Sequence, residues 1–333
     1  MKKVSVATKE VPVNLFKIWI ISSSLNLLLW ALPFIFGKYT DVTFPYIAGN
    51  DIVQELVSLV GTLQGDVHWC PPISPYLENS IRLHDNSDIK IVPKEILVLK
   101  FGIQNGGMWK PSVCQSRYKV AVVIPYRNRT HHLKQFLSHL HPFLIRQQLD
   151  YRIIVVEQYG NSEFNRAKLL NIGFVETLKL VDVDCFIFHD VDLLPVNDFN
   201  IYACTYLPRH MYSAVDTFRY QLPYRNLFGG TIAIQRIHFR AVNGFSNQFY
   251  GWGGEDDDFY SRIERKSLRI IRFDPKIATY IMLPHPKVLP SEDRFHRMNE
   301  GKTSQDYDGL SDLSYEIIDK KLYQLYTWFL AAC

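Results

Sequence analysis

The chain has 333 residues and a formal net charge of +4, from 37 basic and 33 acidic residues. This mild excess, without a basic run in the body of the chain, argues against a nucleic-acid-binding protein. A hydrophobic content of 47% and an aromatic content of 14% exclude a disordered chain and predict one large α/β domain or two small ones.

The N-terminal part of the sequence indicates a membrane anchor. Residues 18–36 contain no charged residue and would form about 28 Å of helix, close to the thickness of a hydrocarbon core. Four lysines precede this run and favour a cytoplasmic N-terminus. A cleaved signal peptide is the alternative, but the apolar run is longer than usual and no clear cleavage site follows it. We expect a cytoplasmic tail over 1–17, an uncleaved transmembrane signal anchor over 18–36, a stem over 37–68 and a luminal domain over 69–333.

The cysteines fit an oxidising lumen. There are five, at Cys70, Cys114, Cys185, Cys204 and Cys333. None forms a C-x-x-C pair, so the sequence does not predict a zinc site. Four could form two disulfides and leave one over. Chain order suggests Cys70–Cys114 and Cys185–Cys204 with Cys333 free, although sequence alone does not fix the connectivity.

Strands and helices alternate in the middle of the chain. Continuous apolar runs predict buried strands over residues 118–125, 151–157 and 184–189. Helical periodicity separates them over 131–148, where we expect Pro142 to kink or split the helix, and over 164–180. This alternation predicts an α/β fold with a mostly parallel, Rossmann-like sheet and helices on both faces.

The residues that follow the three predicted strands share one chemistry. They are Arg127 and Arg129 after the first strand, Phe164 and Arg166 after the second, and Asp190, Val191 and Asp192 after the third. Arginine pairs with phosphate in two-pronged geometry, an aromatic ring can pack on a base, and spaced carboxylates can hold a divalent cation. Ligands bind beyond the carboxyl ends of parallel strands, so this edge predicts a site for a nucleoside diphosphate with a metal ion. Any one of these features alone would be explained as ordinary solvent-exposed surface residues.

At this point the residues match a known family. Residues 118–315 resemble the β-1,4-galactosyltransferases of glycosyltransferase family 7, which are Golgi type II membrane enzymes with a GT-A fold. The matching stretches are IPYRNR (124–129), FNRAKLLNIGF (164–174), FHDVDLLPVND (188–198), LPYRNLFGG (222–230), NGFSNQFYGWGGEDDDF (243–259) and MLPH (282–285). The resemblance therefore implies a GT-A catalytic domain in the Golgi lumen.

The resemblance also implies roles for single residues. The Mn²⁺ ligands would be Asp192, Met282 and His285. The UDP-binding residues would be Arg127, Arg129, Phe164, Arg166, Asp190 and Val191. A methionine is normally a core residue, so only the resemblance selects Met282.

Residues 255–258 place four carboxylates side by side at the start of a predicted helix that runs to about residue 266. The positive end of the helix dipole offsets part of their repulsion. An ordinary acidic first turn is the alternative reading. By resemblance, Asp256 is the catalytic base for the acceptor hydroxyl, Glu255 contacts the donor sugar and Asp257 the acceptor.

Trp252 lies between two glycines, which indicates a hinged lid whose indole covers the sugar nucleotide. The resemblance implies that residues 286–299 close together with this loop. Arg294 and Phe295 in that segment would then line the acceptor pocket.

Leu227 is the informative departure from the family pattern, because vertebrate galactosyltransferases carry tyrosine there. Members with Leu or Ile resemble β-1,4-N-acetylgalactosaminyltransferases, since leucine leaves room for an N-acetyl group that tyrosine would crowd. We therefore expect Mn²⁺-dependent, inverting transfer of GalNAc from UDP-GalNAc to a terminal β-GlcNAc of a glycoprotein or glycolipid.

Two other functions stay open. One is galactose transfer from UDP-Gal within the same family. The other is a catalytically silent, lectin-like or chaperone-like homologue, against which the intact candidate base and metal ligands argue. A homodimer, linked through Cys333 or otherwise, and a membrane partner are also left open by the sequence.

Overall fold

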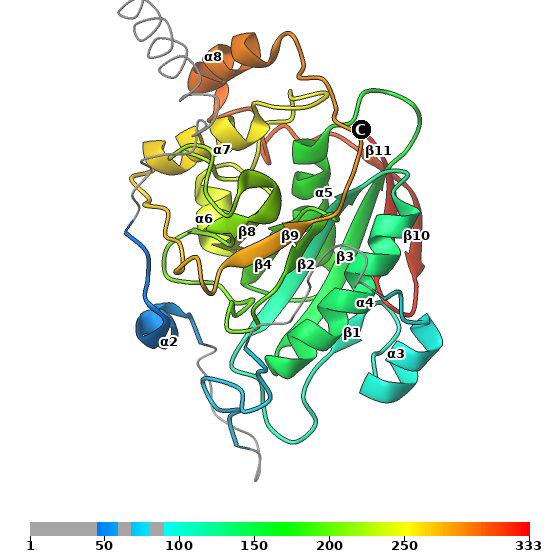
Figure 1. Cartoon of the computed structure of the whole chain (residues 1–333). Helices are drawn as coiled ribbons and strands as arrows, with labels where there is room; N and C mark the ends of the chain where they lie inside the picture. Colours follow the sequence, from blue (N-terminus) through cyan, green and yellow to red (C-terminus); the bar gives the residue numbers. More distant parts are fainter. Residues whose placement is uncertain (1–44, 59–67, 80–89) are drawn as a thin grey trace, which may run out of the picture. The chain divides into compact units, whose positions relative to one another are not determined.

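A mixed eight-stranded sheet forms the centre of the fold (Figure 1). In spatial order its strands are β10 (Glu316–Leu322), β11 (Thr327–Ala332), β3 (Asp150–Gln158), β2 (Lys119–Tyr126), β4 (Cys185–His189), β8 (Thr231–Gln235) and β6 (Arg209–His210), and β1 (Met108–Trp109) also pairs with β3. Of the pairs in this sheet, β11–β3, β3–β2 and β2–β4 are parallel and the others antiparallel. The prediction of a mostly parallel sheet is therefore right for the centre and wrong for the flanks. On one flank a short connection joins β10 and β11, which makes that pair antiparallel.

The computed structural model describes residues 45–58, 68–79 and 90–333, all within one unit that spans 44–333. Within these ranges no helix combines the length and the apolar character that a membrane span requires. The predicted anchor over 18–36 lies outside them. Part of the predicted stem belongs to the folded unit, since Ile52 and Leu56 are buried in the main hydrophobic core.

The three apolar runs form β2, β3 and β4, each within one residue of the predicted bounds. In β2 every residue after Lys119 is buried. Strands covered on both faces have no polar alternation, which explains why these runs are continuous in the sequence.

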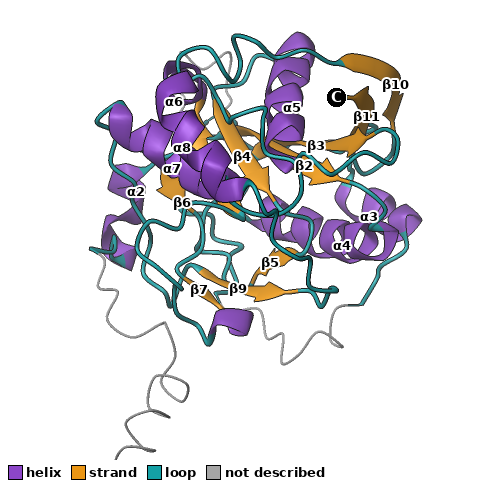
Figure 2. Cartoon of the chain, turned by 90° about the horizontal axis from the view of Figure 1, so that it is seen from above, coloured by secondary structure: helices purple, strands orange, loops and turns teal. Residues whose placement is uncertain are grey.

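Helices cover both faces of the central strands (Figure 2). Helix α4 (Thr130–Arg146) packs in the cluster with Val120 and Val122, whereas α5 (Arg166–Leu180) packs in the other cluster with Ala121 and Val123. Pro142 does not split α4. Burial of the neighbouring apolar side chains offsets the hydrogen bond that proline removes.

A second, three-stranded sheet lies in the order β5 (Leu193–Pro195), β9 (Thr279–Met282) and β7 (Ala214–Val215). The other helices are α2 (Ile52–Glu55), α3 (Lys94–Phe101), α6 (Arg236–Ala241), α7 (Glu255–Arg265) and α8 (Arg294–Ser304), with 3-10 turns η1 (Gly49–Asp51) and η3 (Asp216–Phe218). Leu193 lies opposite Met282 in the small sheet. This pairing brings Asp192, which follows β4, close to the end of β9.

Two disulfides join Cys70 to Cys114 and Cys185 to Cys204, as chain order suggested. Cys333 is free. The second disulfide fixes the start of β4, the strand that leads to Asp190 and Asp192.

Candidate active site

Arg166 joins two groups of carboxylates. Its Nε donates to Asp190 Oδ1 at 2.6 Å, and its Nη1 donates to Asp256 Oδ1 at 3.0 Å. Glu255 Oε1 lies 3.8 Å from the same Nη1. The side chain of Arg166 is 13% exposed, so these charges interact with little screening by water. One guanidinium thus connects the end of β4 to the start of α7.

The acidic turn has the local geometry that its sequence requires. All four acids lie in the first turn of α7, and Gly254 precedes it with a φ of 97°. This left-handed conformation favours glycine. The carboxylate of Asp256 lies against Gly229, where an added Cβ would overlap its oxygens. Gly229 therefore leaves the space that the predicted base occupies.

The environment of the acids changes their proton affinity. Burial raises the pKa of Asp256 well above its usual range, Arg166 opposes this shift, and Glu255 and Asp190 add to it. Burial likewise raises the pKa of Asp190 to about 6, with Arg166 opposing. A carboxylate with a raised pKa is a stronger base, which suits proton transfer from a sugar hydroxyl.

Two of the three predicted metal ligands, Asp192 and His285, lie close together. His285 Nδ1 is 3.2 Å from Asp192 Oδ2 and 3.1 Å from the carbonyl oxygen of Leu283. Both oxygens only accept hydrogen bonds, so in the neutral ring we assign the proton to Nδ1. The other ring nitrogen, Nε2, then keeps the lone pair that binds a cation.

The predicted ligand set would offer a divalent cation three different donor atoms. Asp192 offers an oxygen, His285 a nitrogen and Met282 a sulfur. In the part of the chain that the structure describes, no cluster of three His, Cys, Asp or Glu side chains could hold a metal. Met282, the last residue of β9, is the predicted third ligand, and its sulfur is a soft donor. Arg129 Nη1 also contacts Asp192 Oδ2, at 2.9 Å.

Arg127 and Phe164 form a pair at the same edge. The guanidinium carbon of Arg127 lies 5.2 Å from the centre of the Phe164 ring, and its Nη1 donates to the carbonyl of Ser162 at 2.5 Å. The side chain of Val191 is buried in the core, so this residue can reach a ligand only through its backbone.

The two segments predicted to close together are hydrogen-bonded to each other. Ser291 N donates to the carbonyl of Trp252 at 3.0 Å, beside a bridge between Trp252 and Pro290. The Trp252 side chain is 56% exposed. Gly251 and Gly253 have φ values of 83° and 100°, so both need the backbone freedom of glycine.

The predicted acceptor residues lie on α7 and α8. Arg294 stacks 4.2 Å from the ring of Phe295, which is 61% exposed. Asp257 accepts a hydrogen bond from the hydroxyl of Tyr224. The sequence interpretation missed the roles of Tyr224 and Gly229, although both belong to the LPYRNLFGG stretch.

Leu227 belongs to that stretch as well. Its side chain is 8% exposed and packs in the hydrophobic core. Its carbonyl accepts a hydrogen bond from Arg272 Nη2 at 2.6 Å. Leu227 lies two residues before Gly229, which is packed against the Asp256 carboxylate.

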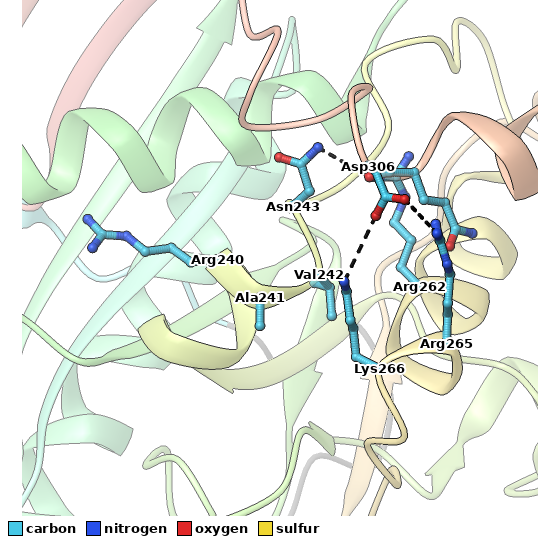
Figure 3. Close-up of a pocket in the computed structure, with 9 residues that line it drawn as sticks. Arg240, Ala241, Val242, Asn243, Arg262, Arg265, Lys266 and Asp306 are labelled. Carbon is cyan, nitrogen blue, oxygen red and sulfur yellow. Dashed lines mark hydrogen bonds and ion pairs between the residues drawn. The ribbon is translucent and has the colours of Figure 1, made fainter.

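A separate cavity of about 240 Å³ lies beside α6 and α7 (Figure 3). Its charged lining residues are Arg240, Arg262, Arg265, Lys266 and Asp306. Arg265 and Lys266 pair with Asp306 at 2.5 and 3.9 Å, and Arg262 is occupied by other acids. None of the predicted site residues lines this cavity, so the candidate chemistry lies elsewhere.

Comparison with known proteins identifies the family. The model for the N-terminal region of glycosyl transferase group 7 matches residues 70–205, and the model for the N-terminal domain of galactosyltransferase matches 209–286. The chain is 40% identical over 276 residues to human β-1,4-galactosyltransferase 4, covering 82% of this chain and 79% of that protein. The chain belongs to glycosyltransferase family 7.

Other curated relatives agree with this assignment to family 7. Mouse β-1,4-galactosyltransferase 1 is 45% identical over 262 residues, an alignment that covers 78% of this chain and 65% of that protein. The chain spans 64–65% of the length of the mouse, bovine and human β-1,4-galactosyltransferase 1.

The catalytic domain of Drosophila β-1,4-galactosyltransferase 7, crystallised with xylobiose, is 31% identical to this chain with a TM-score of 0.52. The match covers 65% of this chain and 94% of that domain. A mutant of the same enzyme has been solved with manganese, UDP-Gal and xylobiose. This family 7 chain therefore has a GT-A fold built on a mixed sheet.

Proposed function

We propose that this family 7 chain transfers GalNAc from UDP-GalNAc to a terminal β-GlcNAc in a β-1,4 link, with inversion and with Mn²⁺ as cofactor. The observation that carries the proposal is the bridge from Asp190 through Arg166 to Asp256, with contacts of 2.6 and 3.0 Å. Through this bridge, the carboxylate of Asp256, the proposed general base, is separated by a single guanidinium group from Asp190, a proposed UDP-binding residue. The manganese and UDP-Gal in the structure of the Drosophila relative support the cofactor and the class of donor.

Asp256 acts as the general base. It accepts the proton of the acceptor hydroxyl while that oxygen bonds to the anomeric carbon, and the bond from that carbon to the diphosphate oxygen breaks. UDP leaves with the bonding electrons, and the proton ends on Asp256. A single displacement turns an α-linked donor into a β product, so the reaction needs one base and no enzyme nucleophile.

The other residues bind and orient the donor. Arg127 and Arg129 contact the phosphates of UDP, and Phe164 packs on its uracil ring. Asp192, Met282 and His285 would hold Mn²⁺. When bound, the cation neutralises charge that develops on the departing diphosphate. Glu255 contacts the donor sugar, and Trp252 covers it. The acceptor is contacted by Asp257, Arg294 and Phe295.

Leu227 supports GalNAc as the donor sugar. Leu227 is buried and lies two residues before Gly229, which packs against the Asp256 carboxylate. A tyrosine there would add volume and a hydroxyl beside the sugar, whereas leucine leaves an apolar wall for the N-acetyl methyl group. The curated relatives are galactosyltransferases, which makes UDP-Gal the second candidate donor.

A donor comparison tests this proposal. We expect the wild-type chain with Mn²⁺ and a β-GlcNAc acceptor to prefer UDP-GalNAc over UDP-Gal. Leu227→Tyr should shift the ratio of the two kcat/KM values towards UDP-Gal by about 10–200-fold, because one small steric difference is worth that much. Leu227→Ile is the matched control and should keep the wild-type ratio.

Two outcomes would contradict it. A wild-type preference for UDP-Gal would make the enzyme a galactosyltransferase and Leu227 a packing variant. No transfer from either donor, in a chain that still binds UDP, would favour the silent homologue.

We also propose that residues 18–36 anchor the protein in the Golgi membrane with the catalytic unit in the lumen. The two disulfides support an oxidising compartment. Protease protection of a C-terminal tag in sealed microsomes checks this topology, and a tag cleaved without detergent would contradict it.

A further inference from the structure

The short turn η3 is fastened to the end of β9, the strand that carries Met282. Asp216 Oδ1 accepts hydrogen bonds from the backbone N–H of Met282 at 2.9 Å and from that of Thr217 at 2.8 Å. One carboxylate oxygen thus fixes the backbone of both residues. Thr217 is held beside Met282 even though the two are 65 positions apart in the chain.

The hydroxyl of Thr217 also contacts the sulfur directly. Its Oγ1 donates to Met282 Sδ at 3.6 Å. A thioether is a weak acceptor, but methionine has three rotatable bonds, each with three staggered wells. One directed contact at the sulfur is therefore enough to select among conformations that differ little in energy.

The other two proposed ligands are held in a similar way. Arg129 contacts Asp192 at 2.9 Å, and the carbonyl of Leu283 accepts from His285 Nδ1 at 3.1 Å. Replacing a residue that hydrogen-bonds to a metal ligand typically lowers metal affinity by about 10–100-fold. Thr217 occupies this place for the sulfur.

We propose that Thr217 is a positioning residue whose hydroxyl orients the Met282 sulfur and thereby sets the affinity of the site for Mn²⁺. The inference rests on the proposed function, because it requires Met282 to be a metal ligand. The hydroxyl engages one lone pair of the sulfur and leaves the second for the cation.

Direct metal titration tests the inference without any transfer reaction. Mn²⁺ is added to the full chain in the absence of nucleotide, and free Mn²⁺ is measured by electron paramagnetic resonance. Thr217→Val removes the hydroxyl at constant size and should raise the Kd for Mn²⁺ about tenfold, the lower end of the range for residues that hold a metal ligand. Thr217→Ser keeps the hydroxyl and should bind as the wild type does. Thr217 is exposed, so both variants should keep the wild-type thermal midpoint.

Met282→Leu separates the two ways in which the idea can fail. If Met282→Leu weakens Mn²⁺ binding while Thr217→Val does not, the positioning role is wrong and the metal site stands. If Thr217→Ser binds as weakly as Thr217→Val, the hydroxyl is not the cause. If Met282→Leu binds Mn²⁺ as the wild type does, the sulfur is not a ligand, and both the inference and the proposed metal site are overturned.

Discussion

At the scale of the residue, the four adjacent acids of α7 have three different partners, because Glu255 and Asp256 share Arg166. Asp256 contacts Arg166, Asp257 contacts the Tyr224 hydroxyl, and Asp258 pairs with Arg262 at 2.6 Å. The sequence was enough to predict the helix start and the favourable dipole there. It could not give Arg166 as the partner, since that residue lies 90 positions away.

Replacing Asp256 by Asn should stop transfer and leave ligand binding intact. The amide cannot accept the acceptor proton, so we expect kcat to fall about 10²–10⁴-fold. Arg166 still contacts Asp190, so the Kd for UDP should stay within about threefold. Steady-state transfer rates at saturating substrate measure kcat, and calorimetry measures the Kd for UDP. Asp182→Asn, at an exposed acid away from the site, is the control, and retained turnover in Asp256→Asn would refute the assignment.

At the scale of the element, α8 packs on α7 through its backbone (Figures 1 and 2). Gly301 is buried, and a Cβ placed there would come within 2.5 Å of Asp258 Oδ1. That carboxylate is itself fixed by Arg262, which also reaches Asp308 at 3.1 Å. Glycine, normally unfavourable inside a helix, is therefore required for the close approach of the two helices.

Gly301→Ala should loosen α8, although alanine usually stabilises a helix. We expect a loss of about 1–3 kcal/mol, because the new methyl group displaces a buried ion pair. Hydrogen exchange of the α8 amides should accelerate relative to those of α5. Lys302→Ala on the exposed side of the same helix serves as the control. Equal or slower exchange in Gly301→Ala would contradict the packing argument.

The elements differ in how well the sequence predicts them. Strands β2, β3 and β4 and helices α4 and α5 follow from apolar runs and periodicity, because each is long enough to show a pattern. The strands of the small sheet are two to four residues long and carry no such pattern. Met282 lies on one of them, which is why only family resemblance selected it. The contact between Trp252 and Pro290 joins two loops and has no local signal either.

At the scale of the whole molecule, the two disulfides close loops of different length. Cys70 and Cys114 are 44 positions apart, and Cys185 and Cys204 are 19 apart. A cross-link stabilises a protein mainly by restricting the unfolded chain, more so for the longer loop. Cys333 closes no loop.

The loss of stability on removing each disulfide should follow the same order as the loop lengths. The loop-entropy relation gives a loss of about 4 kcal/mol for Cys70→Ala with Cys114→Ala, and about 3 kcal/mol for Cys185→Ala with Cys204→Ala. Urea unfolding measures both. Cys333→Ser should change stability by less than about 1 kcal/mol. A larger effect at Cys333 than at either pair would show that the loops are not the source of the stability.

Strand β11 has a consequence for when the protein can fold. It comes last in chain order but lies inside the sheet, between β10 and β3, with Phe329 and Ala331 fully buried. Synthesis proceeds at roughly 5–20 residues per second, so the flank of β3 is exposed until residues 327–332 have been made. The sheet is therefore completed only after these residues have been synthesised, and until then β3 can pair with β1 and β2 but lacks its β11 partner over residues 154–158.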